Sequence, residues 1–314
     1  MDAVTSHSHY ERLIAKAREL EPVATAVAHP CSEFSLRGAF EAGEEGLIRP
    51  ILVGPAARIT AIAKQAQLDV SFFEIVDTPH SVASAERAVA LVREGKAALL
   101  MKGSLHTDEL LSACMHKDTG LRTGRRVSHV FIMDVPTYSD PLFITDAAVN
   151  IFPDLESKRD IIQNAIDLHL GLGLGAPRVA ILSAVETVTA KIPSTIEAAA
   201  LCKMADRKQI TGGELDGPLA LDNAISLDAA RIKGIVSKVA GQAQILVVPD
   251  LEAGNMLAKN LSFLAGADAA GIVLGARVPV ILTSRADNVK ARLASCAVAG
   301  LYAHYLAQNQ PVRA

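Results

Sequence analysis

The stretch SVASAERAVALVREGKAALLMKGSLHTDELLSACM, residues 81–115, decides the fold class. Its first part, Ser81–Arg93, carries apolar residues on one helical face, and Gly95 follows as a stop signal. The apolar run Ala97–Met101 then predicts a buried strand, and a polar loop leads into a second helical stretch, Asp108–Met115. Helix, strand and helix in succession are typical of a mostly parallel sheet covered by helices.

The same alternation of strands and helices extends in both directions from this stretch. Short apolar runs bounded by turn residues predict further strands at Thr25–His29, Pro50–Val53, Phe72–Val76, Val127–Val135, Leu142–Val149, Arg178–Ser183, Gln244–Val248, Gly271–Leu274 and Val280–Thr283. Helical patterns separate most of them, including those after Asp154, at Asn255–Leu264 and at Asn288–Leu306. We therefore expect an α/β fold with two domains, built as three-layer α/β/α sandwiches around mostly parallel sheets.

The composition fits such a fold and argues against several classes of protein. Hydrophobic residues make up 50% of the 314 residues and charged residues 21%, so the chain can bury a large core. The formal charge of -3 argues against a nucleic-acid-binding protein, which is usually basic. No apolar run is long enough to span a bilayer, and residues 1–10 lack the apolar core of a signal peptide. We therefore expect a cytoplasmic protein with no membrane partner.

Cysteine and histidine spacing give no sign of a metal centre. The four cysteines are far apart in the sequence and form no CxxC pair, so reduced and mostly buried thiols are expected. His106, His116 and His129 show no HExxH or similar spacing. We expect these histidines to be structural or surface groups and expect no bound metal.

The loop Lys102–Thr107 lies between the strand Ala97–Met101 and a helix. This order places the loop at the carboxyl edge of a parallel sheet, where anions commonly bind. Gly103 allows close approach of the backbone, and Lys102 offers a positive charge. Ser104 and Thr107 offer hydroxyl groups. An ordinary loop in which a Ser or Thr caps the next helix explains these residues equally well.

Two glycine-containing segments lead to opposite interpretations. Gly120–Arg126 is a basic loop before a strand, and Arg122 with its two neighbouring arginines could meet the phosphates of a nucleotide-like ligand. A solvated positive loop is the alternative for each arginine. Gly171–Ala176 looks like a dinucleotide fingerprint, but its glycines follow a helix and precede the strand Arg178–Ser183, which is the reverse of the required order. We interpret it as a helix-to-strand turn.

The segment Pro249–Asn255 again follows a strand and precedes a helix. It contains Asp250, Gly254 and Asn255, and Asn255 is also suited to capping that helix. Asp216–Asn223 is a polar segment in an apolar stretch, and a plain turn and a binding role explain it equally well.

The segment Thr283–Asn288 ends the last expected strand and opens the last helix. Arg285 offers a planar fork of donors that matches a phosphate, and the hydroxyl of Ser284 can donate to a phosphate or carbonyl oxygen. Asp287 is an acceptor that could take a proton or could cap the helix.

Taken together, these segments resemble the phosphate acetyl/butyryltransferase family. The resemblance rests, in chain order, on Lys102–Thr107, Asp216–Asn223, Val248–Asn255 and Pro279–Asp287. Two runs within these segments are the most specific to the family: Pro-Asp-Leu-Glu-Ala-Gly-Asn and Thr-Ser-Arg. It implies a fold like that of isocitrate dehydrogenases. The expected first domain comprises residues 1–150 and 277–314 and carries the Ser-Arg site. Residues 151–276 form the expected second domain, with the active-site cleft between the two.

The resemblance implies an acyltransferase that interconverts acyl-CoA plus phosphate and acyl phosphate plus CoA, by direct thiol attack in a ternary complex. Ser284 and Arg285 match the family's catalytic pair. Many acetyl-type members have an Asp seven positions after that serine; this position is Ala291 here, and Asp287 looks like the base of butyryl-type members. The expected substrate-binding residues are Lys102, Gly103, Ser104, Thr107, Arg122, Asp250, Gly254 and Asn255. The resemblance also implies no permanently bound cofactor and a homodimer or larger homo-oligomer.

Two other functions stay open from the sequence. A metal- and NAD-dependent dehydrogenase of the same fold would need clustered Asp or His ligands and a cofactor site, and the sequence shows no convincing cluster. A non-catalytic homologue that binds acyl-CoA or phosphate would not need the Ser284-Arg285 pair, which this chain has. Acetyl and butyryl transfer both stay open as well.

Overall fold

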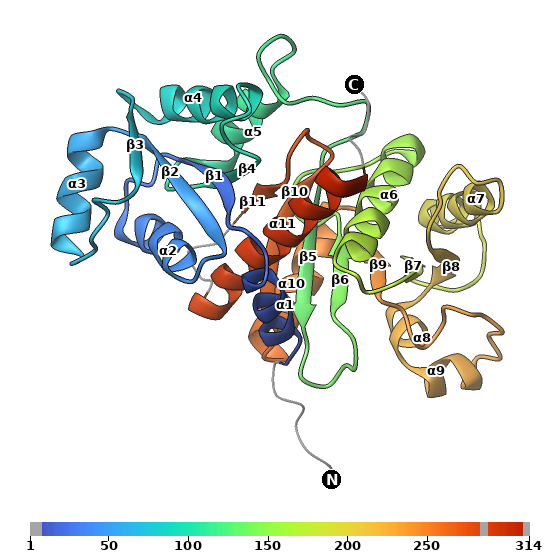
Figure 1. Ribbon diagram of the computed structural model, residues 1–314. Coiled ribbons are helices and arrows are strands. Elements are labelled where there is room, and N and C mark those ends of the chain that lie inside the picture. The colour runs from blue at the N-terminus through green and yellow to red at the C-terminus, as the bar shows by residue number, and fades with distance from the viewer. Residues whose placement is uncertain (1–7, 283–287, 310–314) are drawn as a thin grey trace. The chain divides into compact units, whose positions relative to one another are not determined.

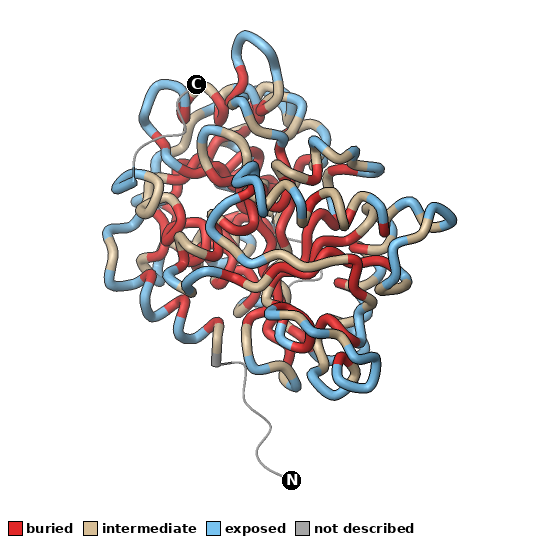
Figure 2. The backbone as a smooth tube through the Cα atoms, turned by 90° about the vertical axis from the view of Figure 1, so that its right-hand side faces the viewer, coloured by how far each residue is buried: buried red, intermediate tan, exposed pale blue. Residues whose placement is uncertain are grey.

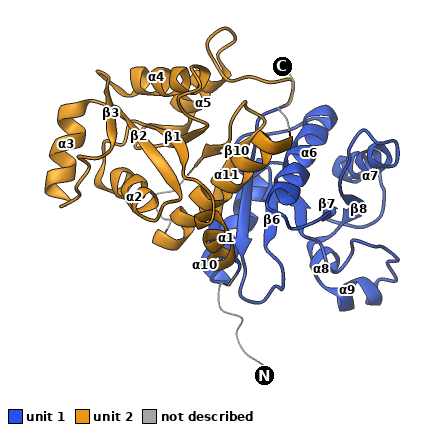
Figure 3. Ribbon diagram, in the orientation of Figure 1, with its two compact units in different colours: residues 1–9, 126–269 blue, residues 10–125, 270–314 orange. Residues whose placement is uncertain are grey.

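The computed structural model describes residues 8–282 and 288–309, and these fall into two compact units (Figure 3). Unit 1 comprises residues 1–9 and 126–269, and unit 2 comprises residues 10–125 and 270–314. The chain thus passes between the units more than once. The sequence placed the first domain boundary between residues 150 and 151, whereas residues 126–150 group with unit 1, because strands from this segment pair within that unit's sheet.

Unit 2 is built on a mostly parallel sheet with the strand order β3-β2-β1-β4-β11-β10 (Figure 1). Its strands are β1 (Val23–Ala28), β2 (Ile48–Gly54), β3 (Glu74–Asp77), β4 (Leu99–Lys102), β10 (Asp268–Leu274) and β11 (Val280–Ile281). Only β10 and β11 pair antiparallel among these described strands. The helices are α1 (Ser8–Arg18), α2 (Glu33–Glu44), α3 (Ala56–Gln65), α4 (Ser81–Arg93), α5 (Thr107–Met115) and α11 (Val289–Asn309).

Unit 1 has the strand order β5-β6-β9-β7-β8. Its strands are β5 (Ser128–Asp134), β6 (Leu142–Thr145), β7 (Arg178–Leu182), β8 (Glu214–Leu219) and β9 (Ile245–Val247). The antiparallel pair β5–β6 is followed by parallel pairing through the rest of the sheet. The helices are α6 (Leu155–Gly171), α7 (Pro193–Asp206), α8 (Leu221–Ile225), α9 (Leu227–Ile232) and α10 (Leu251–Leu264).

The sheet of unit 1 is covered on both faces, and side chains alternate between them. Leu142 and Ile144 of β6 pack in one hydrophobic cluster with Ala258 of α10. Phe143, between them, points to the other face and meets the ring of His169 on α6 at 5.1 Å. Burial on both faces explains why the strands read as continuous apolar runs. Figure 2 shows buried residues concentrated in the interior and exposed residues mostly on the outer loops. The expected α/β class with mostly parallel sheets is confirmed.

The structure corrects one sequence interpretation and confirms another. Asp216–Asn223 is not a plain turn, because residues 214–219 form β8 and residues 221–225 form α8. The glycines of Gly171–Ala176 do lie in a helix-to-strand turn between α6 and β7, where Gly173 and Gly175 adopt positive φ values of 75° and 83°. None of the described helices is both long enough and apolar enough to cross a membrane.

Candidate functional site

The carboxyl ends of β4 and β11 lie side by side in unit 2. The two strands run parallel, with Val280 opposite Leu100 and Ile281 opposite Met101. Lys102 and Leu282, the next residues of each chain segment, therefore leave the sheet at the same edge. Ser284, Arg285 and Asp287 follow Leu282 and lie outside the described residues. The pairing brings Leu282, the last described residue before them, to the edge of the sheet where the loop 102–107 starts.

The first turn of α11 is capped by Asn288. Its Oδ1 accepts a hydrogen bond of 2.8 Å from the amide of Ala291, three residues on, which is the bond of an N-cap side chain. The sequence left open whether Asp287 caps this helix. Because Asn288 makes the capping bond, α11 does not need the carboxylate of Asp287 as its N-cap.

The loop after β4 is fixed to the turn after β1. The hydroxyl of Ser104 donates to the carbonyl of His29 at 2.8 Å and accepts from the amide of Cys31 at 3.2 Å. The amide of Gly103 donates to the carbonyl of Ala28 at 2.8 Å. The half-buried ammonium of Lys102 lies 3.4 Å from the carbonyl of Gly103. The loop is therefore a rigid edge of the sheet, with Lys102 as its cation.

Gly103 is required by the close approach of two backbone segments. A Cβ at this position would lie 2.3 Å from the carbonyl oxygen of Ala28 and 2.5 Å from that of His29. Gly103→Ala is therefore expected to lower the free energy of unfolding by about 3 kcal/mol, because backbone must move to relieve the overlap. Urea unfolding measures the change. The matched control is Gly124→Ala, where an added Cβ meets no atom within 4 Å; equal losses in the two variants would contradict this account.

The start of α5 is capped by Glu109 rather than by a Ser or Thr. One oxygen of the Glu109 carboxylate accepts from the amide of His106 at 2.8 Å, and the other accepts from the hydroxyl of Ser81 at 2.7 Å. These bonds, with that from Ser81 the stronger cause, hold the pKa of Glu109 below its usual range. Thr107 is the half-buried first residue of α5. The capping explanation for the hydroxyls of Ser104 and Thr107 is therefore not supported.

Asp250, Gly254 and Asn255 lie together in unit 1, in the first turns of α10. Oδ1 of Asp250 accepts from the amide of Ala253 at 2.9 Å and caps the helix. The side-chain amide of Asn255 donates to the carbonyl of Ala147 at 3.2 Å. A Cβ on Gly254 would lie 2.7 Å from a methyl of Val248, so only glycine lets the helix pack this closely on the end of β9. The Pro-Asp-Leu-Glu-Ala-Gly-Asn run thus joins α10 to the turn after β6.

The sequence analysis missed this turn, because it extended the strand through Val149. Residue Asp146 ends the strand instead, and its carboxylate accepts from the amides of Ala148, Val149 and Asn150. The side-chain amide of Asn150 also donates to Asp146 and, at 2.8 Å, to the carbonyl of Val127. An Asp followed four positions later by an Asn at the end of an apolar run was the available signal.

His129 of β5 is buried near this turn. Burial lowers the pKa of its imidazole to about 4, and the Asp146 carboxylate acts in the opposite direction without cancelling the effect. Nδ1 of His129 has no hydrogen-bond partner in the described part of the chain. The ring is therefore held neutral in the folded protein.

Lowering the pH from 7 to 4 is expected to reduce the free energy of unfolding by up to about 3 kcal/mol through His129. An unfolded histidine titrates near 6.5 and the folded one near 4, so the unfolded chain takes up the proton first as the pH falls. The stabilisation is complete above pH 6.5 and is lost progressively down to pH 4. Urea unfolding at a series of pH values tests this, with His129→Gln expected to give a flatter profile. A profile as steep as that of the wild type would assign the pH dependence to other groups.

Arg122 is exposed in unit 2. Its loop is held in place by the turn before β11: the hydroxyl of Thr123 donates to the carbonyl of Gly275 at 2.6 Å, and the amide of Arg277 donates to the carbonyl of Leu121 at 2.9 Å. Arg126, in contrast, belongs to unit 1 and donates from Nε to Asn150 at 2.8 Å. The side chain of Arg126 is therefore engaged within unit 1, and Arg122 is an exposed guanidinium held next to the β10–β11 turn.

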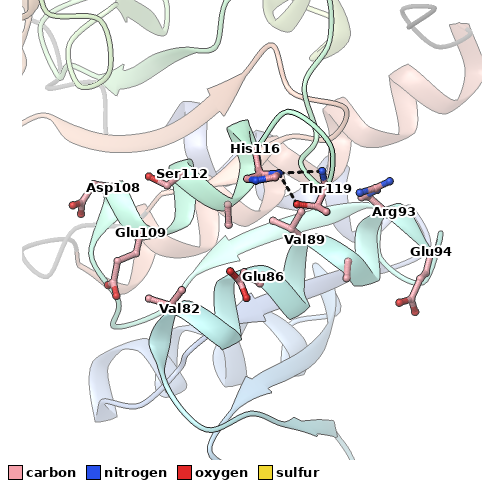
Figure 4. Close-up of a pocket in the computed structure, with 12 residues that line it drawn as sticks. Val82, Glu86, Val89, Arg93, Glu94, Asp108, Glu109, Ser112, His116 and Thr119 are labelled. Atoms are coloured by element: carbon pink, nitrogen blue, oxygen red, sulfur yellow. Dashed lines mark hydrogen bonds between the residues drawn. The ribbon is translucent and has the colours of Figure 1, made fainter.

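A cavity of about 1070 Å³ lies between α4 and α5 of unit 2 (Figure 4). No predicted site residue lines it. Its lining contains one arginine, Arg93, and four carboxylate side chains, those of Glu86, Glu94, Asp108 and Glu109. Nδ1 of His116 accepts from the hydroxyl of Thr119 at 2.8 Å, so this imidazole is engaged at the cavity wall. The excess of negative charge makes the cavity unsuited to a phosphate, and it is not our candidate site.

The predicted residues thus form two groups. Lys102, Gly103, Ser104 and Thr107 gather at the carboxyl edge of the unit 2 sheet, the edge at which Leu282 also ends the described strand segment. Asp250, Gly254 and Asn255 gather at the start of α10 in unit 1. No group of three or more His, Cys, Asp or Glu side chains that could hold a metal ion occurs within residues 8–282 and 288–309.

Comparisons with known proteins give a consistent result over nearly the whole chain. A family model described as phosphate acetyl/butaryl transferase matches residues 81–300. A phosphate acetyltransferase from Rhizobium meliloti is 72% identical over 296 residues, which cover 94% of each chain. A phosphate butyryltransferase from Clostridium acetobutylicum is 42% identical over 288 residues, covering 92% of this chain and 95% of that one. A solved structure, of a branched-chain phosphotransacylase from Enterococcus faecalis V583, is 29% identical with a TM-score of 0.79 and covers 90% of this chain and 99% of that one.

Proposed function

The chain belongs to the phosphate acetyl/butaryl transferase family and exchanges an acyl group between coenzyme A and phosphate, and we propose that Ser284 and Arg285 carry out this exchange. The observation that supports the proposal is the parallel pairing of β11 with β4, because Leu282, which directly precedes the Thr-Ser-Arg segment in the sequence, leaves the sheet at the same edge as Lys102. Homologues with transferase names at 72% and 42% identity do not favour the dehydrogenase alternative.

The reaction is proposed to proceed by direct attack of a thiol on a carbonyl. The coenzyme A thiol has a reference pKa of about 8.5, so a base or a positive field must favour its thiolate. The sulfur forms a bond to the acyl carbon, and the carbonyl oxygen takes up the displaced electron pair. The electron pair on that oxygen then re-forms the carbonyl double bond, and the carbon–oxygen bond to phosphate breaks, its bonding pair leaving with the phosphate. The enzyme forms no covalent bond to the acyl group in this sequence.

Each proposed residue acts on one of these charges. The hydroxyl of Ser284 donates a hydrogen bond to the developing oxyanion. The fork of Arg285 binds two oxygens of the departing phosphate. Lys102 adds positive charge from the neighbouring loop, with Gly103, Ser104 and Thr107 shaping the loop's backbone. Arg122, Asp250, Gly254 and Asn255 are proposed to bind the remainder of the substrates.

Asp287 is proposed to take the thiol proton. Asp287→Asn is expected to lower kcat/KM about a hundred-fold, which is the usual range for loss of a general base. It should also remove the low-pH limb of the pH–rate profile, because the titrating carboxyl is gone. The profile of thioester formation from acetyl phosphate and coenzyme A, the direction in which the thiol loses its proton, checks this from pH 5 to 9, with Asp228→Asn on the exposed helix α9 as the control. An unchanged low-pH limb would assign the base to another group.

The substrate and the assembly can also be proposed. We propose acetyl as the preferred group, since the 72% identical relative is a phosphate acetyltransferase. Coenzyme A then acts as a substrate, and no permanently bound cofactor takes part. We further propose that the chain works in the cytoplasm as a homodimer or larger homo-oligomer.

The function is tested by a substrate panel. Acetyl-, propionyl- and butyryl-CoA are each incubated with inorganic phosphate, and free thiol is followed. Phosphate-dependent release is expected with all three, with the highest kcat/KM for acetyl-CoA. Intersecting rather than parallel initial-rate lines would indicate a ternary complex, since parallel lines are the pattern of a covalent intermediate. Absence of phosphate-dependent thiol release would refute the function and would favour a binding homologue.

A further inference from the structure

His29, the residue that directly follows β1, is held in an uncommon backbone conformation. Its φ of 54° lies in the left-handed region, which only Gln67 and Lys208 share with it among the non-glycine residues that the structure describes. In this region the Cβ of an L-residue crowds the backbone, so a residue stays there only where its surroundings compensate. His29 is also buried, with 8% of its surface exposed. Its contacts therefore have to account for the conformation.

The carbonyl of His29 binds the loop that follows β4. Strands β1 and β4 are neighbours in the sheet, with Ala28 opposite Lys102, so His29 lies at the edge where that loop begins (Figure 1). The carbonyl oxygen accepts from the amide of Cys31 at 2.7 Å and from the amide and the hydroxyl of Ser104 at 2.9 and 2.8 Å. The position of the loop after Lys102 therefore depends on the direction of this carbonyl.

The ring of His29 is bound to helix α4. Its Nδ1 lies 3.0 Å from Oγ of Ser84, which is fully buried. The Ser84 hydroxyl donates its single proton to the carbonyl of His80 at 2.8 Å, so it accepts from its other two neighbours, the hydroxyl of Thr78 at 2.9 Å and Nδ1 of His29. Burial, and after it the charge of Arg58, lower the pKa of the imidazole, so the ring is neutral near pH 7 with its proton on Nδ1.

These bonds form a continuous series from α4 to the loop after β4. The series runs from Thr78 through Ser84 to the ring of His29, and from the carbonyl of His29 to Ser104. Its far end is fixed as well, because the amide of Thr78 donates to the carbonyl of Gly54, the last residue of β2, at 3.2 Å. The ring fixes the side-chain end of His29, and the left-handed backbone then directs its carbonyl to the loop.

We propose that His29 is a positioning residue for acyl transfer: its ring and its left-handed backbone together place the loop 102–107, and with it the ammonium of Lys102. The inference rests on the role proposed above for Lys102 in binding the phosphate. His29 acts in it only through the loop and touches no reacting atom. Displacement of the Lys102 ammonium should therefore weaken phosphate binding. A residue needed only for packing would lower stability and leave the KM for phosphate unchanged.

Two amide substitutions separate the anchoring bond from the bulk of the ring. The side-chain nitrogen of asparagine lies two bonds from Cβ, as Nδ1 of histidine does, and both residues are enriched in the left-handed region. The nitrogen of glutamine lies one bond further out. His29→Asn is expected to keep the KM for phosphate near the wild-type value. His29→Gln is expected to raise it about ten-fold, as for one weakened contact to a charged group, with the KM for acetyl-CoA nearly unchanged.

Initial rates of thiol release over a range of phosphate concentrations measure both constants, and urea unfolding is followed for each variant. The matched control is Gln67→Ala, because Gln67 is an exposed residue with a φ of 56° in the turn after α3. It should leave the KM for phosphate unchanged. Ser84→Ala removes the acceptor of the Nδ1 bond without altering His29, and it should raise this KM in the same direction as His29→Gln. Equal KM values for His29→Asn and His29→Gln, or equal rises for His29→Gln and Gln67→Ala, would overturn the proposal.

A double-mutant cycle tests whether His29 acts through Lys102. In a Lys102→Ala background, His29→Gln should raise the KM for phosphate no further, because the ammonium that His29 places is absent. An equal rise in both backgrounds would overturn the inference and leave the role of Lys102 intact. A wild-type KM for phosphate in Lys102→Ala alone would refute the role of Lys102 and this inference with it. Phosphate-dependent thiol release by the wild type decides the function separately from both.

Discussion

Arg285→Ala is expected to reduce kcat/KM for phosphate-dependent acyl transfer about a thousand-fold or more. Removal of a single neutral donor that stabilises transition-state charge typically costs a hundred- to a thousand-fold, and a guanidinium supplies two charge-assisted bonds at once. The KM for phosphate should rise along with the fall in kcat, because the same fork binds phosphate in the ground state. Initial rates of thiol release over a range of phosphate concentrations measure both effects.

The control for Arg285 comes from the other end of the same strand. Arg277 is exposed and precedes β11, and the bond that its backbone amide makes to Leu121 does not need the side chain. Arg277→Ala should therefore keep near-normal activity, and both variants should unfold at wild-type urea concentrations. Arg285→Lys should recover only part of the loss, because lysine keeps the charge but lacks the fork. Activity of Arg285→Ala within ten-fold of the wild type would remove Arg285 from the reaction centre.

Ser284→Ala is expected to lower kcat several hundred-fold with little change in the KM for either substrate. The hydroxyl is proposed to bind the carbonyl oxygen when negative charge develops on it, and a single such donor typically contributes a hundred- to a thousand-fold. An interaction that is made mainly in the transition state affects kcat and leaves substrate binding nearly intact. Steady-state kinetics with acetyl-CoA and phosphate separate the two parameters.

The outcome for Ser284 distinguishes two roles. A normal kcat with a raised KM would make Ser284 a ground-state binding residue, and the oxyanion would need another donor. Ser139→Ala, at an exposed position in the loop between β5 and β6, serves as the control for the substitution itself. Equal effects at both positions would show that the loss arises from the fold rather than from the chemistry.

The sequence predicted element types well where periodicity was strong. The helix Ser81–Arg93 was predicted at the bounds that the structure shows, and the strand Ala97–Met101 overlaps β4. The order of glycines around Gly173 was enough to reject a dinucleotide site, because that site needs a strand before its glycines. The interpretation of Asp216–Asn223 as a turn was wrong. Its polar residues and proline suggest a turn, whereas hydrogen bonding to β7 holds residues 216–219 in the strand β8.

Several features that matter for the site could not be predicted from local sequence. The capping bond of Asn288 and the bridging hydroxyl of Ser104 depend on which neighbours the fold supplies. The Asp146 turn escaped prediction because the apolar run before it continues into Ala147–Val149. The exposure of Met256 and Phe263 on α10 was equally hidden, since their spacing is that of any helix until the structure shows which face is buried.

The sequence by itself determined the alternation of strands and helices and the loops that carry chemistry, because side-chain periodicity and turn residues act over a few positions. Only the tertiary structure decided that β11 lies next to β4, although about 180 residues separate them in the chain. It also decided that β10 and β11 run antiparallel and that α10 buries Ala258 while Met256 and Phe263 are exposed. These outcomes depend on hydrogen bonds and packing between distant segments, and such contacts leave no local pattern in the chain.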